Sequence, residues 1–382
     1  MNRLCFLLSC CGLYLRVWLS QLQENLWNLT KFIKYRAPNE CRPNSPTLLF
    51  LYYRHKIADS QLYAFHIYRE QLLKSFGLEL IAYPIDSWGC PVVTELFQPK
   101  VIMIQPNFHI DVQDLADTCA QIKAHYPKAR LIFFDWFAPS DLRFASTVEP
   151  FIDLYVKKTI FVDIDQYRAS YFGDTNLMDY YGHLFQCQHE RQQYEVPRTI
   201  DKGLVLGVGF ISAPYLHSLF SWSKPSNCHR PIDLNARFAT HGCEWYSAMR
   251  SAALSKAKGL RAGYAVAHGS LPLAKYLREL GCSKITFSPF GYGEVCWRDY
   301  EAMALGSLLI KPDMGHLEVS PDIFIPYETY IPLAWDFSDF DEKVIHYLNS
   351  PVERLRITRN AFDIGHQYVR QGSFIDYVKD LI

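Results

Sequence analysis

Short, continuous apolar runs alternate with longer amphipathic segments, and this alternation limits the possible folds more than any other feature of the chain. The runs at 47–53 and 101–105 are almost wholly apolar, whereas 60–76 and 111–126 repeat apolar residues at helical spacing. Strands read as continuous apolar runs when helices cover both faces of a parallel sheet. The pattern therefore predicts an α/β fold, with further strands at 78–85, 131–134 and 152–156.

A second alternation follows after a polar, aromatic stretch at about 161–198. We expect strands at 203–210 and 231–239, and a helix at 244–258. Because a single core seldom grows past ~250–300 residues, a chain of 382 residues is expected to form two domains. We place an N-terminal amphipathic helix and linker at 1–44, the first domain at 45–200, the second at 201–350, and C-terminal helices at 351–382.

Composition and motifs exclude several classes of function. The chain has 39 Lys and Arg against 39 Asp and Glu, so it has no overall field that would attract nucleic acid. No G-x-G-x-x-G follows the first strand, which argues against a dehydrogenase. The 11 cysteines form no C-x-x-C pair and no zinc-ligand grouping. Free thiols of this kind indicate a reducing, cytoplasmic setting.

The N-terminal segment begins with an apolar run at 4–15. This run of about a dozen residues is shorter than the ~20 that a membrane-spanning helix needs. No alanine precedes Ala37 to provide the cleavage site of a secretory signal. Leucines continue at helical spacing to Ile33, with Arg16 and Lys31 among the basic residues. Two interpretations stay open: a helix lying on the inner face of a membrane, or a helix packed on its own protein.

The stretch 288–306 carries the clearest chemical signal. A β-prone run at 284–287 stops at Ser288, Gly291 and Gly293 follow, and a helix is expected at about 295–305. Gly306 should end this helix, and 308–310 reads as the next buried strand. Glycines let a ligand approach the backbone closely, and the first N–H groups of the helix point into the loop. The stretch therefore predicts a phosphate site.

Charged residues at predicted element ends suggest further contacts. Arg298 and Glu301 lie three residues apart on one helical face, so a cation for phosphate and a carboxylate for hydroxyl groups project together. Arg237 lies near the end of the strand expected at 231–239, either as a second cation for the ligand or in a surface ion pair. His109 follows another strand, either as a base near neutral pH or as a loop residue without function.

The segment Glu301-Ala-Met-Ala-Leu-Gly306, with the glycine loop before it, resembles the C-terminal half of bacterial group-1-type glycosyltransferases of the GT-B fold. The resemblance implies two Rossmann-like domains facing across a cleft. The first would bind the acceptor and the second the nucleotide-sugar donor, with the last helices returning toward the first domain. In the family two glutamates stand eight positions apart. Here Gly293 stands eight before Glu301 and Glu294 seven before it, so the resemblance implies a sugar contact and a catalytic role for Glu294.

The resemblance predicts a hexosyltransferase that moves a sugar from a nucleotide-diphosphate sugar to an acceptor hydroxyl in cell-envelope or polysaccharide synthesis. The acceptor would be a glycan, a lipid-linked molecule or a small molecule. We assign Gly291, Gly293, Arg298, Glu301 and Arg237 to the donor and His109 to an inverting mechanism as base. No cofactor and no metal are expected, because no D-x-D triplet lies in a convincing metal-binding loop, and the one at 163–165 leads into a helical segment. A nucleotide-sugar epimerase and a two-domain ligand-binding protein remain the alternatives.

Overall fold

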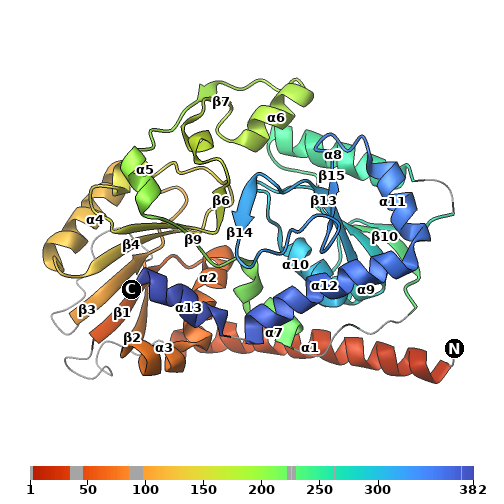
Figure 1. The fold of residues 1–382 in the computed structure, drawn as a ribbon, viewed down its shortest axis with the longest axis horizontal. Coiled ribbons are helices and arrows are strands. Elements are labelled where there is room, and N and C mark those ends of the chain that lie inside the picture. The colour runs from red at the N-terminus through yellow and green to blue at the C-terminus, as the bar shows by residue number, and fades with distance from the viewer. Residues whose placement is uncertain are drawn as a thin grey trace.

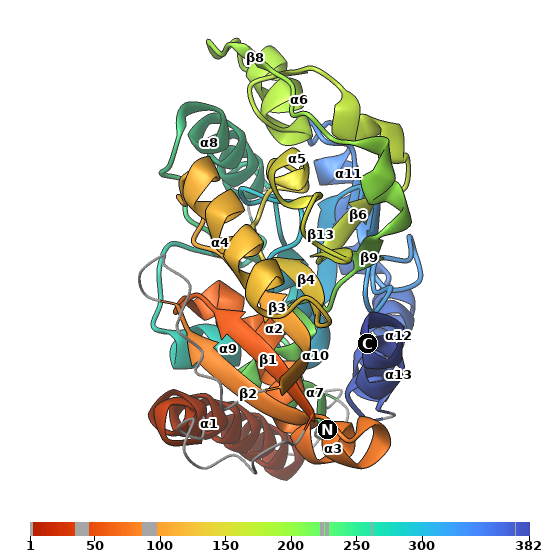
Figure 2. The ribbon, with the colours of Figure 1, turned by 90° about the vertical axis from the view of Figure 1, so that its left-hand side faces the viewer.

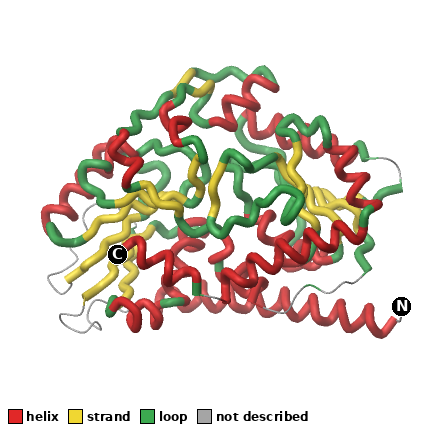
Figure 3. Tube along the Cα trace, viewed as in Figure 1, coloured by secondary structure: helices red, strands yellow, loops and turns green. Residues whose placement is uncertain are grey.

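The computed structural model describes residues 3–34, 46–85, 98–221, 225, 229–260, 263–370 and 372–382. The linker expected near residue 40 lies outside these ranges. Two parallel sheets organise the molecule, and they form the two groups of strands at left and right in Figure 3. The predicted α/β class is confirmed.

The first sheet has six parallel strands in the order β2-β1-β3-β4-β5-β9. Its strands are β1 (Pro46–Tyr52), β2 (Glu79–Pro84), β3 (Gln98–Ile104), β4 (Arg130–Asp135), β5 (Leu154–Lys157) and β9 (Leu204–Leu206). Its helices are α2 (Lys56–Ile67), α3 (Arg69–Phe76), α4 (Val112–His125) and the short α5 (Ala145–Val148). All described residues of β1 after Pro46 are buried, as its continuous apolar run requires.

The second sheet has five parallel strands in the order β11-β10-β12-β13-β15. Its strands are β10 (Ile232–Ala236), β11 (Val266–His268), β12 (Ser283–Phe287), β13 (Leu308–Pro312) and β15 (Ile331–Leu333). Its helices are α7 (Pro214–Ser221), α8 (Glu244–Lys258), α9 (Leu273–Gly281), α10 (Trp297–Leu305), α11 (Phe340–Asn349) and α12 (Pro351–Arg370). The helix expected at 244–258 is thus confirmed.

The segment expected to open the second domain belongs to the first sheet. β9 pairs with β5, with Leu204 opposite Tyr155 and Leu206 opposite Lys157. Between residues 207 and 213 the chain runs through the 3₁₀ turn η4 (Phe210–Ser212) into α7. The expected strand at 203–210 is therefore only three residues long, and it closes one sheet before the chain crosses to the other. Local apolar character predicts a strand but does not say which sheet completes it.

Short elements from each domain meet the other domain. β6 (Thr159–Phe161), which comes directly after β5 of the first sheet, pairs antiparallel with β14 (Leu317–Val319) of the second domain. α6 (Asn176–Leu184) lies over α8 at the top of Figure 1, and in the side view of Figure 2 it remains at the top with α1 at the bottom. The remaining short elements are β7 (Tyr171–Phe172), β8 (Arg191–Gln192), η2 (Ile164–Arg168) and η3 (Arg198–Lys202).

The last helix, α13 (Ser373–Leu381), returns to the first domain. Phe374 is buried with Phe50 and Phe65 in one apolar cluster, and its ring meets that of Phe65 edge-on at 4.8 Å between centroids. The Tyr68 hydroxyl, between α2 and α3, also donates to the Val369 carbonyl oxygen near the end of α12, at 3.0 Å. The end of α12 and the helix α13 are thereby attached to the first domain.

The N-terminal helix α1 (Arg3–Lys34) is continuous and runs beneath both domains (Figure 1). Trp27 is buried and its ring meets Tyr63 of α2 edge-on at 4.8 Å between centroids. Arg16 Nη2 donates to the carbonyl oxygens of Leu219 and Ala304, at 3.0 and 3.2 Å, near the carboxyl ends of α7 and α10. Since a cation is stabilised at such helix ends, Arg16 serves the fold rather than a basic outer surface.

The opposite side of α1 carries an exposed apolar stripe. Five side chains at three- and four-residue steps are 39–70% exposed: Leu15, Trp18, Leu22, Leu26 and Leu29. Of the helices in the described part of the chain, α1 included, none has an apolar stretch sufficient to cross a membrane. The helix is therefore packed on its own protein along one side and apolar along the other.

Candidate functional site

The predicted strand, loop, helix and strand between residues 283 and 312 are all present. β12 ends at Phe287 and α10 begins at Trp297, and Gly306 ends α10 in the left-handed conformation with φ of 72°. Gly293 is required by close approach, because a Cβ at this position would overlap the carbonyl group of Ala138 in the first domain. The glycine loop, residues 288–295, is therefore seated directly on the other domain.

A cleft of about 510 Å³ opens at this loop, between the two domains. Ile57 and Ala138 line it from the first domain, and the start of α10 lines it from the second. It brings together five residues named from the sequence: Arg237, Gly291, Gly293, Arg298 and Glu301. Their shared location follows from topology, since the loops after β10 and β12 leave the same edge of a parallel sheet.

Three guanidinium groups line the cleft. Arg237 forms a two-point ion pair with Glu279, in which Nη2 lies 2.8 Å from Oε2, and its Nη1 also donates to the His268 carbonyl oxygen. Arg298 donates to the Arg237 carbonyl oxygen at 3.1 Å and to Ser288 Oγ at 3.2 Å. Arg237 therefore has its own carboxylate, whereas Arg298 is held by neutral acceptors.

Arg250 of α8 is the third cation, and sequence reasoning missed it. It is only 5% exposed and donates to the carbonyl oxygens of Phe290 and Ala239, at 2.8 and 3.2 Å. Burial lowers the pKa of its guanidinium, the direction expected for a cation without a counter-ion. Its signal in the sequence is an arginine among the buried positions of an amphipathic helix, beside Met249 and four residues after Tyr246.

No carboxylate lies within 4 Å of Arg250 or Arg298 in the part of the chain that the structure describes. A buried cation that lacks a carboxylate, such as Arg250, is costly unless another anion binds to it, whereas Arg298 is only half-buried. Both groups border the same cleft, next to the amino end of α10. This arrangement is suited to an anion with several oxygen atoms.

The amino end of α10 is partly balanced from within. Asp299 accepts the Cys296 N–H at 2.8 Å and the Ser288 hydroxyl at 2.6 Å. Asp299 in turn forms a fully buried ion pair with Lys311 of β13, at 2.5 Å. The negative charge of Asp299 and the positive charge of Lys311 offset each other. The positive electrostatic field at the cleft therefore comes from the arginines and from the amino end of α10.

Glu301 lies one turn along α10 from Arg298 and lines the cleft while remaining largely buried. Its two oxygens accept hydrogen bonds from the hydroxyl groups of Tyr215 and Tyr276, at 2.7 and 2.9 Å. Burial raises the pKa of this carboxyl above its ordinary value, against the opposing effect of the two tyrosines. Each oxygen keeps a second lone pair for a ligand hydroxyl group.

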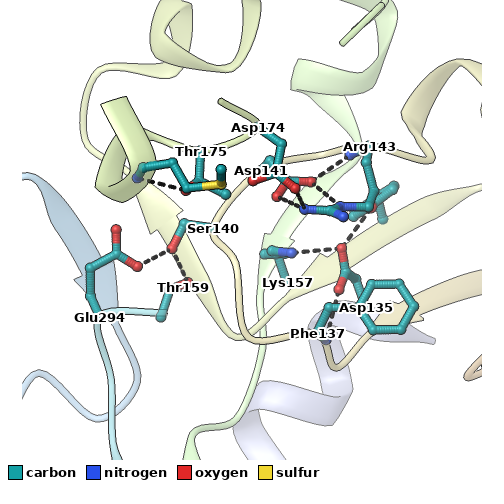
Figure 4. A network of polar contacts seen from close by, with 12 residues as sticks. Asp135, Phe137, Ser140, Asp141, Arg143, Lys157, Thr159, Asp174, Thr175 and Glu294 are labelled. Carbon is teal, nitrogen blue, oxygen red and sulfur yellow. Dashed lines mark hydrogen bonds and ion pairs between the residues drawn. The ribbon is translucent and has the colours of Figure 1, made fainter. Parts of the chain in front are cut away.

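Glu294 is not among the residues that line the cleft. Its carboxylate is buried in the polar network of Figure 4, where it faces Ser140 of the first domain. The Ser140 hydroxyl donates to Oε2 at 2.8 Å, and Asn176 Nδ2 donates to Oε1 at 2.8 Å. Nε2 of His316 lies 3.3 Å from Oε1. The structure thus places Glu294 away from the ligand space.

His109 also lies apart from the cleft. Its side chain is exposed, its backbone N–H donates to Asn107 Oδ1 at 3.0 Å, and its ring meets Phe108 edge-on. The structure does not bring it together with Arg298 or Glu301. Its position after β3 matches the expectation, but this strand end does not contribute to the cleft lining.

The described residues contain no group of three or more metal-ligand side chains. The two aspartates of the D-x-D spacing have local roles. Asp163 caps the turn η2, and Asp165 lies 3.2 Å from Arg198.

Comparisons with known proteins give fold-level similarities only. No protein-family model matches the chain, and no curated protein matches it significantly. Among solved structures, it is similar to an alpha-glucosyltransferase in complex with UDP and a 13-mer DNA, with 10% identity, 88% of this chain and 100% of that chain covered, and a TM-score of 0.49. A glycosyltransferase from Rickettsia africae ESF-5 gives 13% identity, 88% and 99% coverage, and a TM-score of 0.43.

A putative UDP-N-acetylglucosamine 2-epimerase from Listeria monocytogenes is similar as well, with 8% identity, 85% and 93% coverage, and a TM-score of 0.41. These proteins catalyse different reactions. Such low identities and TM-scores do not decide between them for this chain, so its function has to be inferred from its own residues.

Proposed function

We propose that this chain is a metal-independent glycosyltransferase of the GT-B type, which moves a sugar from a nucleotide-diphosphate sugar to an acceptor hydroxyl in glycan synthesis. One observation carries the proposal. Arg250 and Arg298, which have no carboxylate partner among the described residues, border one cleft at the amino end of α10. A diphosphate supplies negative charge directly beside these two cations.

The residues of the cleft fit the chemistry of sugar transfer. The acceptor oxygen bonds to the anomeric carbon while the bond from that carbon to the diphosphate breaks. The electron pair of the broken bond leaves with the nucleotide diphosphate, and the proton of the acceptor hydroxyl passes to an oxygen of that diphosphate or to water. Arg298, Arg250 and Arg237 stabilise the charge that develops on the departing diphosphate. Backbone groups at Gly291 and Gly293 allow its close approach, and Glu301 accepts hydrogen bonds from ribose or sugar hydroxyl groups.

The same cleft favours transfer over epimerisation. An epimerase needs carboxyl groups around the sugar to remove and return protons. Among the described residues that line the cleft, Glu301 is the single carboxylate, and two tyrosines hold it. Incubation with a nucleotide sugar and no acceptor distinguishes the two reactions, because only an epimerase converts the sugar under these conditions. A ligand-binding protein would leave the nucleotide sugar unchanged both with and without an acceptor.

Binding of nucleotides tests the proposal most directly. We expect a nucleoside diphosphate from a panel of UDP, GDP, ADP and CDP to raise the melting temperature, with smaller shifts for the monophosphates. Titration calorimetry then gives the affinity. If no member of the panel stabilises the full-length chain, the proposed function is wrong.

We also propose that the enzyme works in the cytoplasm against the inner face of a membrane, with the apolar stripe of α1 on the lipid. The stripe is exposed over four turns, although the other side of the helix is packed on both domains. Amphipathic helices of this kind bind in the interface region of a bilayer. The thiols of Cys119, Cys187, Cys243 and Cys296 are free, in keeping with a reducing compartment.

Vesicle binding tests this location. Full-length protein should co-sediment with anionic vesicles, and a Leu22→Glu, Leu26→Glu variant should stay in the supernatant with unchanged nucleotide affinity. Ser255→Glu on α8 is a control for added charge elsewhere on the surface. If the wild type remains in the supernatant or self-associates through α1 instead, the membrane assignment is wrong.

A further inference from the structure

Glu294 belongs to the glycine loop, yet its side-chain partners among the described residues, Ser140, Asn176 and His316, do not line the cleft. Ser140 follows β4 and Asn176 begins α6, so both lie between β4 and β9, two strands of the first sheet. His316 precedes β14 in the second domain. The carboxylate, which is 1% exposed, therefore joins segments from both domains at one point.

The connection continues on each side of this carboxylate. Ser140 Oγ lies 3.0 Å from Thr159 Oγ1, and Thr159 is the first residue of β6, which pairs with Val319 of β14 (Figure 4). On the other side, Lys311 Nζ donates to the Glu294 carbonyl oxygen at 2.8 Å and is paired with Asp299 of α10. Glu294 thus links the strand pairing between the domains to the helix that borders the anion site.

Two further contacts restrict the backbone of the glycine loop. Gly291 N–H donates to the Gly293 carbonyl oxygen at 2.9 Å, and the Cα of Gly293 faces the Ala138 carbonyl group without room for a side chain. Ala138 and Ser140 belong to the same first-domain loop. The hydrogen bond from Ser140 to Glu294 therefore fixes the loop against the surface on which Gly293 rests.

We propose that Glu294 is a positioning residue that docks the glycine loop on the first domain, so that the anion site is complete only when the two domains are together. It acts through the backbone at Gly291 to Gly293 and does not contact the sugar. Breaking the link populates arrangements with a displaced loop. The observed affinity for the nucleotide then falls in proportion to the fraction of molecules that can still bind it. The effect on nucleotide affinity rests on the proposed function, whereas the effect on domain docking does not.

Four substitutions, alone and in two combinations, separate docking from direct sugar contact. Glu294→Ala removes the link, and Asn176→Ala and Ser140→Ala remove it from the first-domain side without changing Glu294. Glu294→Gln keeps it, because the amide oxygen accepts from Asn176 and the amide nitrogen donates to Ser140. The probe is UDP, or whichever nucleoside diphosphate binds the wild type best, because it contains no transferred sugar.

Two measurements are made on each folded variant. Hydrogen exchange without ligand at peptides covering 159–162 and 317–319 reports the β6–β14 pairing. We expect exchange there to be about tenfold faster in Glu294→Ala and in the Asn176→Ala, Ser140→Ala double variant, with UDP affinity about tenfold weaker. Glu294→Gln should stay within about twofold of the wild type in both. The Glu294→Ala, Asn176→Ala double variant should bind UDP no more weakly than Glu294→Ala alone, because both substitutions remove the same link.

The inference is overturned if Glu294→Ala leaves exchange and UDP affinity unchanged, as a residue that touches only the sugar would. It is also overturned if Glu294→Gln loses as much as Glu294→Ala, because the charge would then be required. Should Glu294→Ala fail to fold, the first-domain variants decide alone, and unchanged exchange in them refutes docking. If no nucleotide binds the wild type, the proposed function fails and the exchange measurement still tests the domain link.

Discussion

Replacing Arg250 by Met removes one positive charge from the cleft while keeping an unbranched apolar side chain. In the wild type the guanidinium lies over the Tyr246 ring, 4.6 Å from its centroid, and is held by the carbonyl groups of Phe290 and Ala239. A diphosphate that reaches this group gains a charge-assisted hydrogen bond, worth about 1.5–3 kcal/mol. Arg250→Met should therefore weaken UDP binding by about 10- to 150-fold.

The stability of this variant should change much less than its affinity. Two hydrogen bonds to carbonyl groups are lost, at about 1 kcal/mol each. Against this, the protein no longer buries a cation without a carboxylate partner, which is itself unfavourable. Because the two effects oppose each other, we expect the free energy of unfolding to change by less than about 2 kcal/mol. A large loss of affinity with a small loss of stability identifies Arg250 as a binding residue.

Titration calorimetry at two ionic strengths is the assay. The affinity of the wild type should fall with added salt, and that of Arg250→Met should fall less, since one charge has been removed. Arg230→Met is the matched control, because Arg230 also donates to two carbonyl oxygens, of Ser283 and Leu305 at 2.9 and 3.0 Å, but does not line the cleft. If Arg250→Met binds within twofold of the wild type, or if Arg230→Met loses as much, Arg250 is not part of an anion site.

Two further predictions concern the cleft, and a third concerns Lys158 of the first domain, a buried lysine whose amine donates to the Trp136 carbonyl oxygen at 3.2 Å. Glu301→Gln should leave the melting temperature within a few degrees but weaken UDP binding about tenfold, because a ribose hydroxyl group loses a charged acceptor; unaltered affinity in calorimetry would contradict this role. Activity with a nucleotide sugar should survive dialysis against EDTA in full, and its loss with recovery on adding manganese would show a metal requirement. Burial lowers the pKa of Lys158 to about 7, so unfolding takes up a proton between about pH 7 and 10.5 and the free energy of unfolding should rise with pH over that window. Urea unfolding at pH 7.5 and 9.5 should show this rise in the wild type and a smaller one in Lys158→Met; equal slopes would refute the assignment.

Features that depend on neighbouring residues were predictable. The strand at 283–287, the helix ending at Gly306 and the buried strand at 308–312 follow from apolar runs, glycine chemistry and helical spacing, which act within a few residues. Arg298 and Glu301 share the cleft because three-residue spacing on α10 places them on one face. The candidate donor residues predicted in this stretch therefore line one surface.

Features that depend on contacts between distant segments were not predictable. The apolar run at 204–206 is a strand in either sheet, and only pairing with β5 decides which. In the sequence, Arg250 is one arginine on a predicted helix. Only the packing of α8 beside the loop at residue 290 places its guanidinium at the cleft. The sequence predicts Glu294 as a cleft residue, but hydrogen bonds from Ser140 and Asn176 of the first domain hold its carboxylate outside the cleft.

The sequence by itself determined the α/β class, most of the elements and the local segment proposed as an anion site, because periodicity and glycine positions act along the chain. The tertiary structure alone decided which strand closes each sheet, which side of α1 is buried and which carboxylate faces the cleft. These outcomes depend on side chains more than 80 residues apart, such as Tyr215 with Glu301 and Ser140 with Glu294. Burial and hydrogen bonding between such segments are set by packing, which no local pattern encodes.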